Sequence, residues 1–281
     1  MNLEMAALWT GVVCYVATGV TAIGALILSA RRRDAPATPA SAPERFILAV
    51  LFAGLACHAL SIGLRWARLG HGPYVTFFEI LSSNLWSLTA ILAFACWRIP
   101  RLRPLLAFAM PVLFVLIGWM ILLDKSEGPL PATYHTVWLF IHIIFSKLFL
   151  GPVLVAVGIA LVILARHAGR GERLLARLPE TPRLDDLAWR FMAAAFVFEI
   201  LMLITGAIWA QDAWGRYWAW DPLETWAFLT WLLLAVSLHA RLAFRLRPVQ
   251  GAGLILAVFV MAFLTFFGTP FISEVPHQGA V

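Results

Sequence analysis

The stretch Met5–Ala30, MAALWTGVVCYVATGVTAIGALILSA, decides the kind of fold that this chain adopts. It carries no charged side chain along its whole length, and a helix needs about 20 mostly apolar residues to cross the hydrocarbon core of a bilayer. Three arginines, Arg31, Arg32 and Arg33, follow it directly. Because a cleavable signal peptide has a shorter apolar core, we expect this first segment to remain in the membrane.

The composition of the whole chain points the same way. Hydrophobic residues make up 62% of the 281 residues and charged residues 13%, and the mean hydropathy is +0.87. In soluble domains, apolar residues are roughly half of the chain. These values exclude a soluble globular domain, and we predict an all-α integral membrane protein.

Seven further apolar runs reach spanning length, and turn-forming or charged stretches separate them. We therefore predict eight transmembrane helices in one bundle, forming a single polytopic domain over residues 1–281, since no internal repeat divides the chain. The predicted helices lie near residues 7–30, 45–66, 76–97, 104–123, 138–165, 188–210, 222–244 and 250–269.

The distribution of basic residues predicts how the helices are oriented. Cytoplasmic loops of membrane proteins carry an excess of lysine and arginine. The loops after the first, third, fifth and seventh predicted helices, with their flanks, carry 16 of the 21 basic residues. We therefore expect both termini and the loop before the seventh helix to be extracytoplasmic. This sidedness explains the net charge of +6, so nucleic acid is not needed as a partner.

The cysteines and two of the histidines are expected to have no special chemistry. Cys14, Cys57 and Cys96 are far apart, each lies in an apolar run, and no C-x-x-C motif is present. We expect them to be small core residues, so any thiols for redox chemistry must come from another protein. His71 and His167 lie in predicted loops among glycine and arginine, and we expect both to be solvated.

The most aromatic part of the chain is Trp214–Trp226, WGRYWAWDPLETW, just before the seventh predicted helix. Six of the 13 tryptophans lie between Trp209 and Trp231. Indole rings have flat faces that stack on a planar ligand and an N–H that needs an acceptor. Such a cluster is typical of a belt that contacts lipid headgroups, and equally of a surface that holds a flat apolar ligand. We predict an extracytoplasmic tryptophan-rich loop over residues 211–226.

Polar residues in this stretch predict where the seventh helix begins. Asp221 is placed as its N-cap, Pro222 occupies the first helical position, and Glu224 stands three residues after the cap. We expect Glu224 to reach back to the cap as in a capping box. This structural role would also fix the directions of Trp218, Trp220 and Trp226.

Histidine is the other residue type whose placement needs an explanation. His58 and His239 lie inside predicted spans at similar depth. An ionisable residue within a span is costly and indicates a functional site, although either histidine could simply bond to a neighbouring helix. His142, near the start of the fifth span, and His277, after the last span, reach the leaflet of the tryptophan stretch. Neutral imidazole is a common axial ligand of haem iron.

The pattern W-G-x-x-W-x-W-D-x-x-E-x-W resembles the tryptophan-rich WWD signature of haem-handling membrane proteins. Continued to His239, it resembles the CcsA, or ResC, family of cytochrome c biogenesis proteins. The resemblance implies that haem b is held by an external pair, His142 and His277, and by a transmembrane pair, His58 and His239. It also implies a haem-binding surface made of Trp214, Trp218, Trp220, Asp221 and Trp226.

Several positions stay open within this interpretation. His135, two helical turns before His142 and also facing outward, competes for the first external position, although the sequence W-L-x-I-H-I around His142 resembles the family. Arg216 fits a contact with a haem propionate or with a lipid headgroup. Glu79 lies in a segment that weakly resembles a family region. Glu199 also lies in a span, but no chain of acids and bases continues across the membrane as a proton pump needs.

The function that the resemblance implies is the haem-handling part of a cytochrome c synthase in a bacterial plasma membrane. Haem is presented on the outer face to the thiols of the C-x-x-C-H motif of apocytochrome c. A CcsB- or ResB-type membrane protein is the expected partner, because this sequence contains no large extracytoplasmic domain, and thiol-reducing proteins are further candidates. The alternatives are a CcmC-type haem chaperone or exporter without thioether chemistry, a transporter of another substrate, and a structural membrane subunit. No catalytic residue is assigned.

Overall fold

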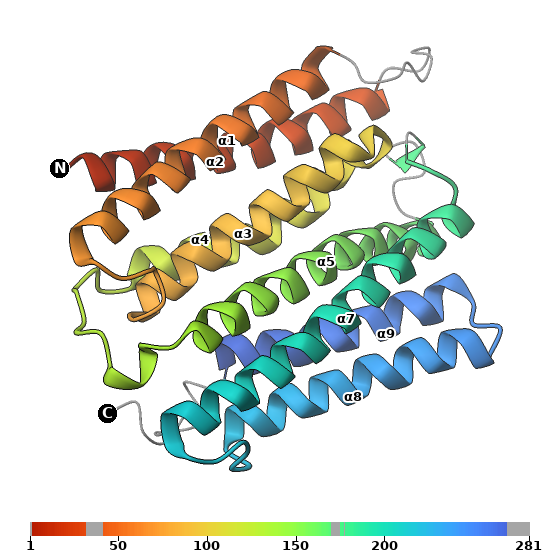
Figure 1. Ribbon diagram of the computed structural model, residues 1–281. Coiled ribbons are helices and arrows are strands. Elements are labelled where there is room, and N and C mark those ends of the chain that lie inside the picture. Colours follow the sequence, from red (N-terminus) through yellow and green to blue (C-terminus); the bar gives the residue numbers. More distant parts are fainter. Residues whose placement is uncertain (1, 32–41, 170–174, 177, 269–281) are drawn as a thin grey trace. The chain divides into compact units, whose positions relative to one another are not determined.

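The computed structural model describes residues 2–31, 42–169, 175–176 and 178–268 (Figure 1). The chain divides into two compact units: unit 1 comprises residues 1–129 and 164–180, and unit 2 comprises residues 130–163 and 181–281. Within the described ranges, eight helices are long and apolar enough to cross a membrane. The prediction of an all-α protein with eight spans is therefore confirmed. The sidedness of the termini and the single domain stay predictions.

Unit 1 contains four of the long helices. They are α1 (Leu3–Arg31), α2 (Ala42–Leu69), α3 (Phe77–Arg98) and α4 (Leu106–Leu122), the last preceded by the 3₁₀ helix η1 (Pro100–Leu105). The most extensive packing in the unit is between α1 and α2, which run side by side in Figure 1. Glycine makes this approach close, because a Cβ on Gly54 would lie 2.7 Å from the Cβ of Cys14.

Local chemistry sets the helix boundaries of unit 1. The Thr76 hydroxyl accepts a hydrogen bond from the backbone N–H of Glu79, and the Glu79 carboxylate accepts one from the N–H of Thr76. This capping box begins α3. Pro100 and Pro104 lie in the predicted break before the fourth span, where the structure has η1 instead of a continuous α-helix.

Unit 2 contains the other long helices. They are α5 (Val137–His167), α7 (Thr181–Trp214), α8 (Pro222–Ala243) and α9 (Pro248–Phe263), with the 3₁₀ helix η2 (Ala132–Tyr134) before α5 and the π-helical turn η3 (Leu264–Gly268) after α9. The helices α7, α8 and α9 pack against one another, and the last turn of α5 belongs to unit 1.

The largest departure from the predicted boundaries is the length of α7. The sequence predicts this helix over 188–210, but it extends into flanking polar sequence at both ends. One reason is that Asp185, predicted to lie in a charged loop, forms an ion pair of 2.7 Å with Arg241 at the end of α8. At its other end α7 continues to Trp214, so the non-helical part of the tryptophan-rich loop is residues 215–221.

Candidate functional site

The start of α8 holds the tryptophan-rich loop in place. The Asp221 Oδ1 atom accepts a hydrogen bond of 2.8 Å from the N–H of Glu224, which confirms the predicted N-cap. The Glu224 carboxylate accepts a bond of 2.7 Å from the N–H of Ala219. We expected this carboxylate to accept a hydrogen bond from the N–H of the cap residue Asp221. That prediction is wrong, because the loop turns back toward the first turn of the helix and the donor is two residues earlier, at Ala219.

Trp220 lies in a backbone conformation that is unusual for its size. Its φ is 59°, in the left-handed region, and its side chain is 67% exposed. This region costs an L-residue roughly 1–2 kcal/mol. The ring of Trp220 meets Trp218 edge-on with centroids 5.7 Å apart, and Phe228 edge-on at 6.1 Å. These contacts and the Asp221 cap hold the strained residue in place.

A first group of aromatic rings continues from the loop into the span. Phe228 stacks on Trp231 with centroids 5.7 Å apart, and Trp231 stacks on Phe196 of α7 at 6.1 Å and an interplanar angle of 12°. We call Trp218, Trp220, Phe228, Trp231 and Phe196 the loop aromatic cluster. The Nε1 atoms of Trp218 and Trp231 are buried without a hydrogen-bond partner among the described residues. Buried donors normally have an acceptor, so these two N–H groups are candidate donors to a bound ligand.

A second aromatic group surrounds His142 near the start of α5. The imidazole ring stacks on Trp209 with centroids 6.1 Å apart and an interplanar angle of 29°. Trp209 in turn contacts Trp214 at 5.0 Å and Tyr134 at 5.8 Å. The predicted residues His142 and Trp214 therefore belong to one contiguous aromatic surface, and Trp209 and Tyr134 are additional members.

The Nδ1 atom of His142 lies 2.9 Å from the carbonyl oxygen of Met202. Because a carbonyl only accepts, the imidazole proton sits on Nδ1 and the Nε2 atom carries the lone pair. Gly206 makes room for the ring, since a Cβ there would lie 2.7 Å from Nδ1. Metal-ligating histidines commonly donate their second nitrogen to a carbonyl in this way. The donor set at His142 thus fits a ligand of haem iron.

His58 has a different environment in the core of unit 1. Its side chain is fully buried, the Tyr15 hydroxyl lies 3.2 Å from Nδ1, and the Ser82 hydroxyl lies 2.9 Å from Nε2. Both ring nitrogens therefore have hydrogen-bond partners. The imidazole fits haem iron chemically, but iron reaches Nε2 only if Ser82 gives up its hydrogen bond.

The structure gives no binding environment for the other two predicted histidines, His239 and His277. His239 is exposed on α8 and shares a helix face with the exposed side chains of Leu232 and Val236. His277 lies outside the described residues. Because His58 belongs to unit 1 and His239 to unit 2, the transmembrane pair stays a prediction.

His135 lies apart from His142. It is exposed and is the C-cap residue of η2. Because α5 begins only at Val137, His135 and His142 do not lie on one face of a continuous helix. His71 corrects another expectation: it is only 7% exposed, and its Nδ1 atom lies 2.9 Å from the carbonyl oxygen of Gly72. Its ring packs near Tyr74 at 6.3 Å, which removes it from solvent. Arg216 is exposed in the loop.

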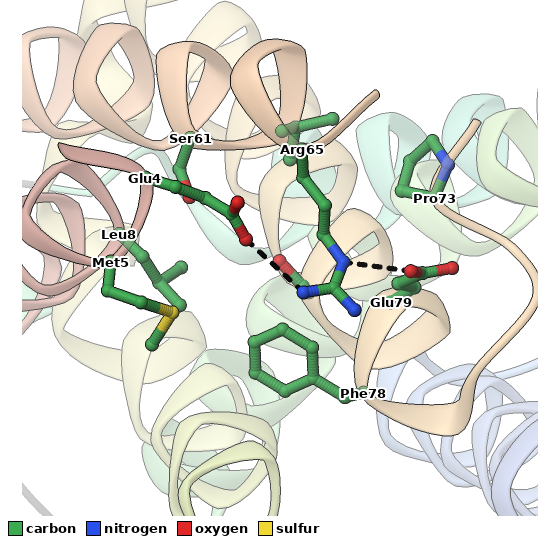
Figure 2. A pocket seen from close by; sticks show the side chains of 10 residues that line it. Glu4, Met5, Leu8, Ser61, Arg65, Pro73, Phe78 and Glu79 are labelled. Carbon is green, nitrogen blue, oxygen red and sulfur yellow. Dashed lines mark hydrogen bonds and ion pairs between the residues drawn. The ribbon is translucent and has the colours of Figure 1, made fainter. Parts of the chain in front are cut away.

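An ion-pair cluster in unit 1 was not anticipated from the sequence. The guanidinium of Arg65 lies between Glu79, at 2.8 Å, and Glu4, at 3.2 Å, as Figure 2 shows. All three side chains are buried. At the surface Arg68 bonds to Glu4 and to Glu127, and its hydrogen bond lowers the pKa of Glu127 below the usual value. We call Glu4, Arg65, Arg68, Glu79 and Glu127 the Arg65 cluster.

Two observations place this cluster beside His58. A small cavity beside Arg65 is also lined by Ser61 and Ser82, and Ser82 contacts His58.

Elsewhere in the chain, Glu199 of α7 is fully buried and neither carboxylate oxygen has a hydrogen-bond partner among the described residues. The two acidic residues of the spans therefore differ: Glu79 is paired with Arg65, and Glu199 has no partner among the described residues.

Comparison with known proteins gives three consistent results. The sequence pattern of the family described as cytochrome C assembly protein matches residues 49–277. The cytochrome c biogenesis protein CcsA of Prochlorococcus marinus strain NATL1A is 30% identical over 251 residues, which cover 76% of this chain and 78% of that protein. CcsA of Chlamydomonas reinhardtii is 28% identical over 226 residues, and the match spans 63% of its length.

A solved structure shares the fold. The cytochrome c haem lyase CcmF superposes on 95% of this chain with a TM-score of 0.68, at 16% sequence identity, and the match covers 47% of the CcmF chain. At this identity the likeness concerns the fold alone.

Proposed function

Because this chain belongs to the cytochrome c assembly protein family, we propose that it is the haem-handling subunit of a cytochrome c synthase, which presents haem for attachment to apocytochrome c. The family assigns a role in cytochrome c biogenesis, and the eight long apolar helices make the chain a multi-pass membrane protein. Haem is the substrate in this proposal. It would be haem b, because the free vinyl groups are what the reaction consumes.

The observation that carries the proposal is the arrangement at His142. One ring nitrogen is bonded to the Met202 carbonyl, the ring stacks on Trp209, and the aromatic surface continues to Trp214. A planar macrocycle needs flat apolar surface and an imidazole with a fixed tautomer, and this part of the chain supplies both. We assign His142 as the first external ligand and His277 as the second.

The work of these residues is positioning. Holding a vinyl group next to a thiol converts an encounter between two molecules into a reaction within one complex. Each thiol of the C-x-x-C-H motif adds across one vinyl double bond, with sulfur joining one carbon and hydrogen the other, so no external oxidant is consumed. The loop aromatic cluster shields the ring system while His142 and His277 orient it.

The remaining parts of the proposal concern the partner and the membrane. We infer that the active face is extracytoplasmic, as the distribution of arginine and lysine favours, and that the membrane is a bacterial plasma membrane. A CcsB- or ResB-type membrane protein completes the synthase. The transmembrane histidines His58 and His239 would hold haem before it reaches the outer site.

The test is the absorption spectrum of the purified protein together with its histidine variants. The wild type is expected to copurify with haem and to show a Soret band. His142→Ala should abolish cytochrome c maturation in cells, with partial rescue by added imidazole, because a small ligand can enter the vacated position. His135→Ala is the matched control and should mature cytochrome c normally. A wild-type protein without a Soret band, or normal maturation by His142→Ala, would contradict the proposal.

A further inference from the structure

The small cavity of unit 1 has an ionic and hydroxylic wall (Figure 2). Side chains of α1, α2 and α3 form it, and Pro73 of the loop between α2 and α3 contributes to it. The space is large enough for about one water molecule. Cavities that stay empty in proteins are lined by apolar groups. The wall here includes Glu4, Arg65, Ser61 and Ser82, so its composition predicts an occupant that forms hydrogen bonds.

Arg65 can donate more hydrogen bonds than its partners in the chain accept. Its Nε atom donates to Glu79, its Nη1 atom to Glu4 and its Nη2 atom to the carbonyl oxygen of Ser126. Both terminal nitrogens carry a second N–H. A buried cation is stabilised only when its remaining donors are also hydrogen-bonded. The cluster therefore has capacity for a further acceptor beside the guanidinium.

The two serines of the wall also have capacity for a further partner. Ser83 and Ser87 donate to carbonyl oxygens of the preceding helical turn. Ser61 is 5% exposed, and its hydroxyl forms no such bond among the described residues. The Ser82 hydroxyl lies 2.9 Å from Nε2 of His58, and a hydroxyl with one hydrogen bond keeps at least one free lone pair. Donors and acceptors thus meet at the same cavity.

From this lining we propose that one ordered water molecule occupies the cavity and connects the Arg65 guanidinium to the hydroxyls of Ser61 and Ser82. Water both donates and accepts, so it can accept from an N–H of Arg65 and donate to the two serine oxygens. A buried water typically makes about three hydrogen bonds, and this wall supplies that number of partners. The inference does not depend on the proposed function.

Size and charge both select water over other occupants. The space is too small for an organic ligand. A bare cation would be repelled by Arg65, and an anion would be repelled by Glu4 and Glu79, since charges interact strongly where water is scarce. A small neutral molecule that donates and accepts avoids both repulsions.

The water has a structural consequence for unit 1. The Ser82 hydroxyl would be held between the water and the imidazole of His58. The Arg65 cluster and the hydrogen bonds of His58 would then form one continuous network across α1, α2 and α3. Networks of this kind fix the packing of the helices that contribute to them when every member is satisfied.

Radiolytic labelling tests for the water directly. Short X-ray pulses convert water into hydroxyl radicals, which oxidise the side chains next to it. The full chain is purified in detergent, equilibrated with water enriched in a heavy oxygen isotope and irradiated, and mass spectrometry locates the incorporated isotope. Phe78 lines the cavity and is only 3% exposed, so the wild type should be labelled there. Phe149 is 0% exposed and does not line the cavity, so it should remain unlabelled.

A pair of variants ties the label to this cavity. Ser61→Val removes a partner of the water and fills its space with methyl groups, so Phe78 should lose most of its label. Ser87→Val is the matched control, because Ser87 is also a buried serine of unit 1 but does not line the cavity. This variant should retain the label. If Ser61→Val does not fold, the comparison of Phe78 with Phe149 in the wild type still decides.

Three results would overturn the inference. The first is a wild-type protein in which Phe78 is unlabelled. The second is equal labelling of Phe78 and Phe149, which would report general opening of the protein. The third is a folded Ser61→Val protein that retains the wild-type label on Phe78. None of these measurements involves haem, so each would leave the proposed function standing, and a missing Soret band would leave the water site standing.

Discussion

The two units differ in how the buried polar groups around their candidate sites are paired. In unit 1 the buried guanidinium of Arg65 has two carboxylate partners, and both nitrogens of His58 have hydroxyl partners. In unit 2 the carboxylate of Glu199 and the indole N–H groups of Trp218 and Trp231 have no partner among the described residues. The Thr18 hydroxyl and two nitrogens of Arg103 in unit 1 also lack one, but the unpaired indole N–H groups of unit 2 belong to an aromatic surface, where we propose that a ligand binds.

The difference also assigns separate tasks to the units. In unit 1 the charges of the Arg65 cluster are paired, and both nitrogens of His58 are hydrogen-bonded. In unit 2, flat rings and a histidine bonded to a carbonyl form the surface on which we propose that haem binds. Substitutions that remove the same kind of group should therefore have opposite effects on stability in the two units.

The largest expected effect is on the Arg65 cluster. Arg65→Met leaves Glu4 and Glu79 buried without their shared cation, and breaking a buried ion pair in this way costs about 3–5 kcal/mol. Thermal unfolding in detergent should show a clear loss of stability. Arg68→Met is the control: its side chain is 42% exposed, so its removal should cost much less. Equal losses for both variants would show that burial does not govern the cluster.

The opposite sign is expected for Glu199. Glu199→Met replaces a buried carboxylate without a partner by an apolar side chain of similar size, which removes a desolvation cost of about 1–3 kcal/mol. The unligated protein should become more stable in the same thermal assay. A loss of stability comparable to that of Arg65→Met would abolish the contrast between the units.

The span positions and the cap of α8 were predictable because each depends on a short stretch of sequence. Twenty apolar residues define a span wherever they occur, and Asp221, Pro222 and Glu224 stand within one helical turn. The limit of this reasoning appears at α7. Its apolar run gives the membrane part of the helix, but the ion pair of Asp185 with Arg241, which lies on another helix, extends it.

The contacts that organise the sites could not be predicted in the same way. Glu4, Arg65 and Glu79 are far apart in the sequence, and each acidic residue alone is explained as a helix-start residue. A usable signal was present, since an arginine at the end of one apolar run and acidic residues at the starts of two others must share one side of the membrane. The partners of His58 carried no such signal, because Tyr15 and Ser82 are ordinary residues within spans.

A smaller effect is expected where the backbone makes room for His142. A Cβ on Gly206 would lie 2.7 Å from the Nδ1 atom, so Gly206→Ala must displace the imidazole ring. Haem affinity at the outer site should fall roughly tenfold, within the cost of modest overpacking. Gly253→Ala is the control, because nothing lies within 4 Å of a Cβ at that position. Haem titration by absorbance compares the two, and equal affinities would separate Gly206 from the site.

The smallest effect concerns the strain stored at Trp220. A glycine adopts its φ of 59° without cost, so Trp220→Gly relieves roughly 1–2 kcal/mol that Tyr217→Gly does not. Both side chains are exposed, Trp220 by 67% and Tyr217 by 61%, and both variants gain the same chain entropy on unfolding. Thermal unfolding should therefore find Trp220→Gly the more stable of the two variants. Haem titration should nevertheless show that Trp220→Gly binds haem more weakly than Tyr217→Gly. The Trp220 ring, which this variant lacks, extends the aromatic surface beside Trp218 and Phe228. If Trp220→Gly were the less stable variant, packing of the indole would outweigh the strain, and the loop would be stabilised by its contacts as the Arg65 cluster is.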